Sequence, residues 1–287
     1  MTNTHKHCPV CNSTHLTHKW SVNKYSLIEC KSCSLVFVKE IPSSTELNAY
    51  YNAESDVAYS NDNIECLNYY YETLRDIIQK YHPTPGRILD IGCSGGWFLD
   101  VMNNWECFGT EISQADANLA KKNHRDNIFV GSFEDYPENN GKFDVITLQD
   151  VFDHLPQPTE ALEKCHRLLK PNGLIVIKVH NISCLYAKVT GSNFYAIIPP
   201  GHLYYYNKNT LYRILQNTGF SPVCYKYIPH ILKVSMIFLR LSKGNKMSLY
   251  YKIHSKLKDS VIGNIRIKKN LRDIITVFAT KTSAGVH

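Results

Sequence analysis

The sequence predicts an α/β protein, in which a doubly wound parallel sheet follows a small cysteine-rich unit. Two observations predict this fold class. From residue 87 onward, short β-branched runs alternate with helical segments, as they do where strands are joined by crossover helices. Two Cys-x-x-Cys pairs precede them. With 287 residues, 44% of them hydrophobic and 20% charged, the chain can bury a substantial core, which excludes a disordered protein.

The cysteine-rich unit spans residues 1–40 and contains a strand-like segment from Lys19 to Glu29. Its two pairs are separated by 18 residues and consist of Cys8, Cys11, Cys30 and Cys33. Two such turns can direct four thiolates at one ion, so the spacing predicts a zinc ribbon that binds Zn²⁺. Because four thiolates leave no coordination position for water, the predicted metal is structural.

Residues 41–86 follow as a tyrosine-bearing connector and a helix. Apolar residues recur at helical spacing from Asn63 to His82, and Pro83 ends that pattern. Residues 87–287 then form the predicted α/β domain. Its parallel strands are expected at residues 87–92, 107–112, 128–131, 143–148 and 174–179.

A glycine-rich turn follows the first of these strands, in the run Asp90-Ile-Gly92-Cys93-Ser94-Gly95-Gly96. Such a turn lets the backbone approach a ligand closely. The run is not a dinucleotide-binding fingerprint, because Ser94 and Trp97 occupy two of its glycine positions. It is not a P-loop either, because no Gly-Lys-Ser or Gly-Lys-Thr follows.

The turn resembles that of the class I S-adenosylmethionine (SAM) methyltransferases. Asp90, Gly92 and Gly96 match that family's acid and glycines, and Ser94 replaces its middle glycine. Further similar segments follow in the family's order, so that the resemblance covers about residues 50–281. It implies a Rossmann-like, seven-stranded sheet that ends in an antiparallel hairpin, interrupted here by a basic insertion at 229–270. It also implies SAM as cofactor and S-adenosylhomocysteine as product.

The same resemblance implies the cofactor-binding residues. Glu111 would accept the ribose hydroxyls, Ile112 would pack on the adenine, and Ser132 with the backbone of Phe133 would meet the adenine edge. The full implied set is Asp90, Gly92, Cys93, Ser94, Gly96, Glu111, Ile112, Ser132, Phe133, Gln149 and Tyr59.

Two histidines are candidates for the catalytic base that an acceptor hydroxyl or acidic carbon would need. His154 follows the fourth strand and His202 precedes the last helix. A structural role is the alternative for each, a bond to a loop carbonyl for His202 and support of the cofactor loop for His154. Asp153 and Asp150 are expected either to cap the helix near Pro158 or to orient His154.

A narrower similarity concerns the acceptor. The ribbon, the tyrosine connector and a Pro-x-x-His-x-x-Tyr-Tyr segment are similar to bacterial methyltransferases of surface-polysaccharide and nucleotide-sugar pathways. This implies O- or C-methylation of a sugar, a sugar nucleotide or a glycan-linked small acceptor. RNA methylation and a non-catalytic binding protein with the SAM fold are the alternatives. The three consecutive tyrosines, residues 204–206, are expected to divide between core and pocket.

The net charge of +7 has a local origin. Residues 233–272 contain 11 Lys or Arg and one acid, so the rest of the chain is slightly acidic. This argues against a nucleic-acid partner. Apolar residues recur at helical spacing within the segment, from Ile231 to Leu241 and from Leu249 to Leu257. It therefore predicts either peripheral membrane contact or a lid or dimer face. A polar N-terminus predicts a cytoplasmic protein, with the inner membrane face as a peripheral location.

Overall fold

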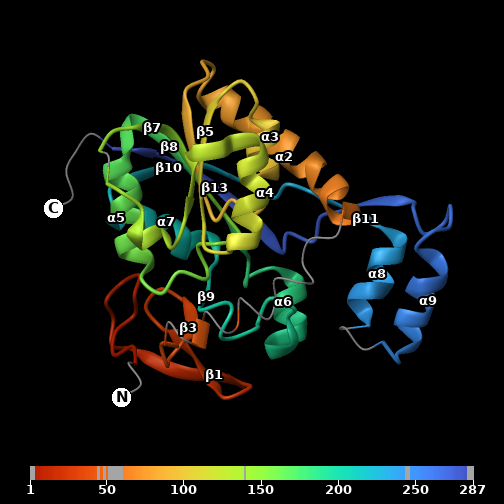
Figure 1. The fold of residues 1–287 in the computed structure, drawn as a ribbon. Helices are drawn as coiled ribbons and strands as arrows, with labels where there is room; N and C mark the ends of the chain where they lie inside the picture. The colour runs from red at the N-terminus through yellow and green to blue at the C-terminus, as the bar shows by residue number, and fades with distance from the viewer. Residues whose placement is uncertain are drawn as a thin grey trace.

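The computed structural model describes residues 4–43, 46, 47, 50, 61–138, 140–242 and 246–282. Its centre is a seven-stranded sheet in the order β10-β13-β8-β7-β4-β5-β6, which confirms the predicted Rossmann-like class (Figure 1). The strands are β4 (Arg87–Ile91), β5 (Glu106–Glu111), β6 (Ile128–Val130), β7 (Phe143–Gln149), β8 (Leu169–His180), β10 (Phe220–Lys226) and β13 (Ile274–Lys281). The first five run parallel, and β13 pairs antiparallel with both β8 and β10.

Helices cover both faces of this sheet, because its buried strands alternate apolar side chains between two hydrophobic clusters. Ile88 and Val145 face the layer of α2, α3 and α4, whereas Leu89 and Ile146 face α5 and α7. The helices are α2 (Asn61–Tyr81), α3 (Trp97–Val101), α4 (Gln114–His124), α5 (Pro158–Leu168), α6 (Leu185–Thr190), α7 (Lys208–Asn217), α8 (Val234–Leu241) and α9 (Leu249–Leu257). The described helices include none that is long and apolar enough to cross a membrane.

The cysteine-rich unit forms a second, antiparallel sheet at the bottom of Figure 1. It contains β1 (Leu16–Val22), β2 (Tyr25–Cys30) and β3 (Val36–Val38), and its fourth strand is β9 (Tyr204–Tyr205). The prediction of one strand-like segment from Lys19 to Glu29 was wrong, since β1 and β2 are a hairpin. Its turn uses Asn23 at φ 53°, a conformation that asparagine tolerates and the alternating pattern does not reveal.

The strand β9 belongs to the later part of the chain, yet it pairs with β3 at Val36↔Tyr205 and Phe37↔Tyr204. One hydrophobic cluster therefore runs from the ribbon strands into the face of the large sheet that α5 and α7 cover. The expected division of Tyr204, Tyr205 and Tyr206 between core and pocket was wrong, because all three are buried. A strand covered on both sides buries successive side chains whichever way they point.

Between β10 and β13 the chain leaves the sheet and forms β11 (His230–Lys233), α8, α9 and β12 (Arg266–Lys269). The strands β11 and β12 pair antiparallel, and the rings of His230 and Tyr70 stack 5.0 Å apart, which attaches this segment to α2. The helical pattern expected from Ile231 was wrong at its start, because Ile231 lies in β11 and α8 begins at Val234. The helix expected from Leu249 to Leu257 is confirmed as α9.

Candidate active site

The chain order of the strands reverses at β4, and we call the space beyond the carboxyl ends of β4, β5 and β7 the crevice. After β4 the chain adds β5 and β6 on one side, and then returns to add β7 on the other side. In open parallel sheets, ligands bind at the carboxyl ends of strands beside such a reversal. Asp90, Glu111 and Gln149 lie at the carboxyl ends of β4, β5 and β7. The sequence-predicted residues thus come together at this edge.

The glycine-rich turn after β4 has a backbone that needs small residues. Gly92 and Gly96 have φ of 70° and 82°, and Ser94 has φ of 48°. A Cβ on Gly92 would lie 2.4 Å from Cγ2 of Val151, so the turn has no room for a side chain there. Cys93 points inward and is buried, which leaves its backbone as the part that borders the crevice.

Glu111 anchors this turn to the end of β5. Its Oε2 accepts the backbone N–H of Ser94 at 2.9 Å, and its Oε1 accepts that of Ser113 at 2.8 Å. Burial raises the pKa of Glu111, and these two hydrogen bonds oppose the shift. Each carboxylate oxygen keeps acceptor capacity for a ligand hydroxyl. The neighbouring Ile112 side chain is 53% exposed, so an apolar surface lies next to this acceptor.

Asp90 is buried between β4 and β7, and it accepts hydrogen bonds from Thr147 Oγ1 at 2.5 Å and from Gln149 Nε2 at 3.4 Å. Burial raises the pKa of Asp90 to about 7. Ser94 Oγ and Gln149 Oε1 are buried without a hydrogen-bond partner among the described residues. Buried polar atoms normally have partners, so these two atoms indicate where a polar ligand would bind.

The remaining predicted contacts lie after β6. Ser132 Oγ donates to Asp135 at 2.8 Å, and Phe133 is buried. The carbonyl oxygen of Phe133 accepts a hydrogen bond from Nζ of Lys164 at 2.9 Å. Lys164 is a buried residue of α5 that was not among the sequence-predicted site residues. Tyr59 lies outside the described residues.

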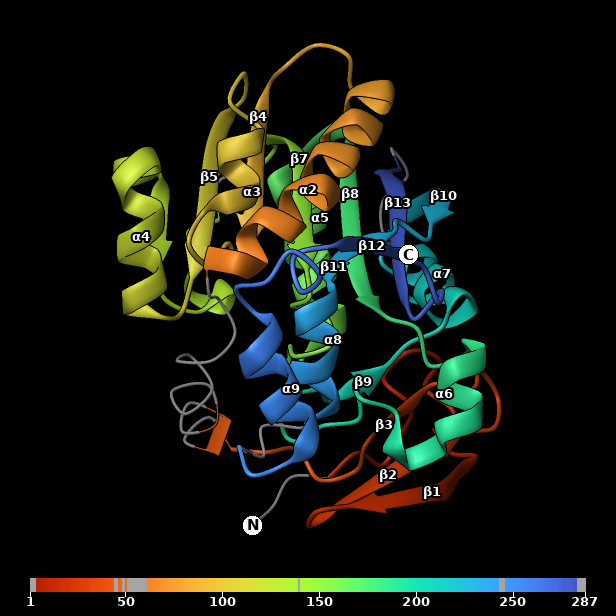
Figure 2. The same ribbon diagram turned by 90° about the vertical axis from the view of Figure 1, so that its right-hand side faces the viewer.

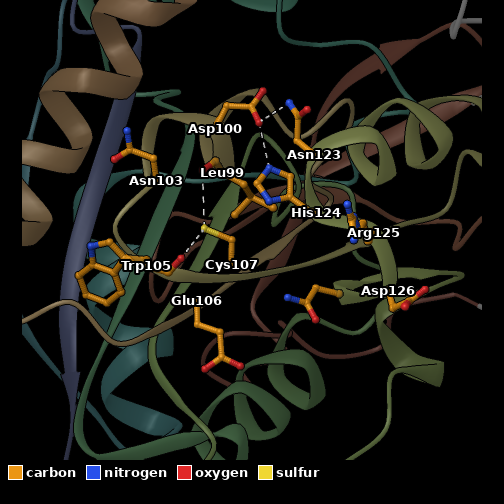
Figure 3. Close-up of a pocket in the computed structure, with 11 residues that line it drawn as sticks. Leu99, Asp100, Asn103, Trp105, Glu106, Cys107, Asn123, His124, Arg125 and Asp126 are labelled. Atoms are coloured by element: carbon orange, nitrogen blue, oxygen red, sulfur yellow. Dashed lines mark hydrogen bonds and ion pairs between the residues drawn. The ribbon is translucent and has the colours of Figure 1, made fainter.

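The hollow drawn in Figure 3, of about 600 Å³, lies at the opposite end of β5. It is lined by the start of that strand and by the ends of α3 and α4. Within it, Asp100 bonds Asn123 at 2.8 Å and His124 at 3.0 Å. None of the sequence-predicted cofactor or catalytic residues lines it, so the hollow is separate from the crevice.

Asp153, in the loop after β7, lies among three histidines. Its Oδ2 is 3.3 Å from Nδ1 of His180 and 3.9 Å from Nδ1 of His202, and its Oδ1 is 3.8 Å from Nε2 of His154. The ring of His202 is centred 4.6 Å from that of His154 and 4.9 Å from that of His180. Oδ1 accepts no hydrogen bond from the described residues. The structure therefore brings both predicted histidines together.

His180 is the member of this cluster that the sequence analysis missed. It ends β8, and the parallel pairing of β7 with β8 brings it beside the loop that carries Asp153. The expectation that Asp150 or Asp153 caps α5 was wrong, because the N-cap of α5 is Gln157 and no side chain caps it. Asp150 instead pairs with Lys178 at 2.5 Å.

His202 has a defined tautomer. Its Nδ1 donates to the carbonyl oxygen of Ala196 at 2.7 Å, because a carbonyl can only accept. Burial lowers the pKa of His202 to about 4, so the ring is neutral at pH 7 and its Nε2 holds a lone pair. Although burial opposes its ionisation, Asp153 has a lowered pKa because of the surrounding histidines, His202 foremost. A carboxylate thus lies beside a neutral imidazole ring.

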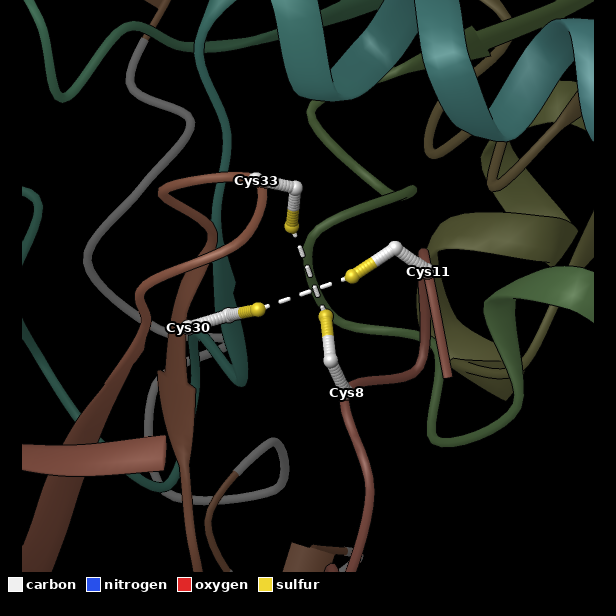
Figure 4. A group of neighbouring side chains, drawn as sticks. All are labelled: Cys8, Cys11, Cys30 and Cys33. Carbon is white, nitrogen blue, oxygen red and sulfur yellow. Dashed lines mark hydrogen bonds between the residues drawn. The ribbon is translucent and has the colours of Figure 1, made fainter. Parts of the chain in front are cut away.

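The four ribbon cysteines converge on one point (Figure 4). The Sγ atoms of Cys8 and Cys33 are 3.5 Å apart, as are those of Cys11 and Cys30. Zn–S bonds of about 2.3 Å in a tetrahedron require S–S separations of about 3.8 Å. The chain turns back after each pair. The N–H of Asn12 donates a hydrogen bond to the carbonyl oxygen of Cys8, and the N–H of Ser34 donates one to the carbonyl oxygen of Cys30. The four sulfur atoms are therefore arranged as ligands of one tetrahedral metal ion would be.

Comparison with known proteins agrees with the crevice and its turn. Residues 66–225, more than half of the chain, match the family model described as a methyltransferase domain. The chain belongs to this family. Its Rossmann-like fold is that of a methyltransferase domain.

Two relatives of this chain are both named ubiquinone biosynthesis O-methyltransferase. The one from Pseudomonas aeruginosa is 30% identical over 128 residues, which are 40% of this chain and 54% of the relative. The one from Xanthomonas axonopodis is 26% identical over 146 residues, 46% of this chain and 60% of the relative. The chain thus spans about half the length of the curated relatives it matches.

A solved structure supports the fold. A SAM-dependent methyltransferase from Archaeoglobus fulgidus superposes with a TM-score of 0.51 at 21% identity. The superposition covers 81% of this chain and 99% of that structure.

Proposed function

We propose that this chain transfers the methyl group of SAM to a hydroxyl of a small or glycan-linked acceptor, with a sugar or sugar nucleotide as the acceptor class. The observation that carries the proposal is the buried His202, whose tautomer leaves Nε2 as a proton acceptor while its Nδ1 lies 3.9 Å from the Asp153 carboxylate. The relatives named as O-methyltransferases support transfer to oxygen. Transfer to an acidic carbon would use the same base.

The crevice residues fit SAM. Glu111 has two oxygens placed for the ribose hydroxyls, and the exposed Ile112 offers an apolar surface for the adenine. The orphaned Ser94 Oγ and Gln149 Oε1 would gain partners. The backbone of the turn at Gly92 and Cys93 approaches the ligand because no side chain intervenes. Contacts from Ser132, Phe133 and Tyr59 stay predictions.

When bound, SAM supplies an electrophilic methyl group on a sulfonium that leaves as a neutral thioether. The residues of this chain then orient the acceptor and remove its proton. His202 Nε2 takes the hydroxyl proton as the oxygen–methyl bond forms, and the Asp153 carboxylate stabilises the imidazolium that results. His180 donates from Nδ1 to Asp153 at 3.3 Å and positions it. His154, edge-on to His202, stays a second candidate for the base.

We also propose that Cys8, Cys11, Cys30 and Cys33 hold one structural Zn²⁺. The sulfur spacing and the two backbone turns support it. A unit of about 40 residues has too little core to fold alone, so metal binding would supply much of its folding free energy. The division into residues 1–40, 41–86 and 87–287 stays a prediction.

The cofactor proposal predicts that Glu111→Ala weakens S-adenosylhomocysteine binding by about 10- to 100-fold, because hydrogen bonds to a buried carboxylate are lost. Isothermal titration calorimetry measures this. Glu106→Ala is the matched control, since Glu106 lies on the same strand but is exposed and paired with Arg87. Unchanged affinity in a folded Glu111→Ala protein would contradict the proposal.

We expect cofactor binding to depend on pH because of the raised pKa of Asp90. Its pKa of about 7 in the free protein means that it is largely protonated at pH 6. The proposal sets the α-ammonium group of S-adenosylhomocysteine near Asp90, and a cation there favours the carboxylate form, so binding would release a proton. Affinity therefore rises with pH, by up to about tenfold per unit below 7, and levels off above it.

Calorimetry from pH 5.5 to 8, in buffers of different ionisation enthalpy, measures both the affinity and the released proton. Asp90→Asn is expected to remove the dependence, whereas Asp126→Asn, at an exposed position, keeps it. A flat profile for the unaltered chain would argue against this role.

We expect that removing the His202 imidazole lowers turnover but leaves the affinity for the cofactor unchanged. His202→Ala is expected to lower kcat by about 10²- to 10⁴-fold, because proton removal becomes rate-limiting. The assay follows transfer from labelled SAM to a panel of sugar nucleotides and diphenols, with calorimetry of S-adenosylhomocysteine as a check on folding. His18→Ala, at an exposed ribbon position, is the control. Full activity of His202→Ala would transfer the role to His154.

The ribbon predicts about one zinc per chain by elemental analysis. Cys30→Ser, at a fully buried ligand position, should lose the metal and lower Tm, because β9 and its neighbours lose the sheet on which they pack. Cys224→Ser removes a cysteine outside the cluster and should keep the zinc. A metal-free protein with an unchanged Tm would refute the structural role.

A further inference from the structure

The helices α8 and α9 project from the side of the molecule and extend toward the same end as the ribbon (Figures 1 and 2). The two helices and the turn that follows them are joined by hydrogen bonds. The N–H groups of Val234 and Ser235 donate to the carbonyls of Ile265 and Gly263 at 3.0 Å each, and His254 Nδ1 donates to the carbonyl of Ser235 at 2.9 Å. A Cβ on Gly263 would meet the carbonyl oxygen of Leu257 at 1.8 Å, so the turn after α9 packs tightly on that helix. The outward residues are thus held in place.

That turn exposes large aliphatic side chains. Val261 is 87% exposed, Ile262 60% and Ile265 51%. Aliphatic residues gathered in this way on a surface mark a site of interaction, because water would otherwise order around them.

Exposed lysines precede these aliphatic residues in the chain. Lys252, Lys256 and Lys258 are exposed on α9 and directly after it. We call the set Lys252, Lys256, Lys258, Val261, Ile262 and Ile265 the hairpin face. The segment from residue 233 to 272 has 11 cations and a single acid, Asp259. The hairpin face therefore combines apolar groups that avoid water with cations that favour a negative surface.

Charge and apolar surface together distinguish the possible binding partners of the hairpin face. A second copy of this chain, docked through the same face, would set two strongly cationic surfaces against each other, which is unfavourable. RNA would match the charge but would gain little from Val261 and Ile262, since nucleic acids use aromatic platforms for their bases. An anionic bilayer matches both properties, because its phosphates attract lysines and its acyl region takes up aliphatic side chains.

We propose that the hairpin face docks this enzyme on an anionic phospholipid membrane. Val261, Ile262 and Ile265 enter the headgroup boundary, and the three lysines lie among the phosphates. Because the rest of the chain is slightly acidic, only this side is attracted, and the docking has one orientation. None of these residues belongs to the candidate active site, so the proposal stands or falls separately from the proposed function.

Flotation of the full chain with vesicles tests the proposal. The chain is expected to float with vesicles of equal parts phosphatidylcholine and phosphatidylglycerol, less so as salt is raised, and not with phosphatidylcholine alone. Lys252→Ser with Lys256→Ser and Lys258→Ser should weaken binding more than tenfold, because each lysine near an anionic surface contributes a factor of about five. Val261→Ser with Ile262→Ser should weaken it several-fold at unchanged charge.

Matched controls come from α4, on another side of the molecule (Figure 2). Leu119→Ser removes a 43% exposed leucine, and Lys121→Ser with Lys122→Ser removes two lysines. Both should bind vesicles like the unaltered chain, and all variants should bind S-adenosylhomocysteine equally. Three results would each overturn the proposal: no binding to anionic vesicles, a dimer that the hairpin variants dissociate, or RNA binding that is tighter than vesicle binding and lost with the same lysines.

Discussion

The backbone of Asp153 connects the parts of this molecule. Its carbonyl oxygen accepts the N–H groups of Leu203 and Tyr204, at 2.8 and 3.2 Å. The carbonyl of Leu203 in turn accepts the N–H of Val38, at the end of β3, at 2.9 Å. One short chain of hydrogen bonds thus joins the loop after β7, the segment that follows His202, and the cysteine-rich sheet. The position of the histidine cluster depends on this junction, because both of its loops are held there.

The junction gives the cysteine-rich unit a fixed place against the methyltransferase domain. Further bonds cross the same boundary, from Asn23 to the carbonyl of Pro199 at 3.3 Å and from Thr159 to that of Pro9 at 3.2 Å. Tyr205 bonds the carbonyl of His202 at 2.9 Å from within the ribbon sheet. A ribbon held by metal would therefore be a rigid wall for the acceptor side of the crevice, in place of the flexible loops that usually line such sites.

The sequence predicted what depends on local pattern. The glycine turn and the parallel strands follow from spacing and periodicity, Glu111 follows from the family resemblance, and the structure has these elements. Contacts between distant segments left no such signal. His180 joins Asp153 only through the register of β7 on β8, and β9 joins the ribbon across more than 160 residues. The β1–β2 turn at Asn23 was missed, although the apolar alternation changes phase there, from Trp20 and Val22 to Tyr25 and Leu27.

Two buried carboxylates show how their surroundings separate their roles. Asp90 and Asp153 are both almost fully buried. Asp90 has a hydroxyl and an amide as its hydrogen-bond partners, so burial dominates and its pKa rises to about 7. Asp153 has three imidazoles within 4 Å, which lower its pKa despite burial. The first can therefore become charged when a cationic ligand arrives, whereas the second already carries the charge that an adjacent imidazolium needs. In the proposed function, the difference between these two carboxylates would separate cofactor binding from proton removal.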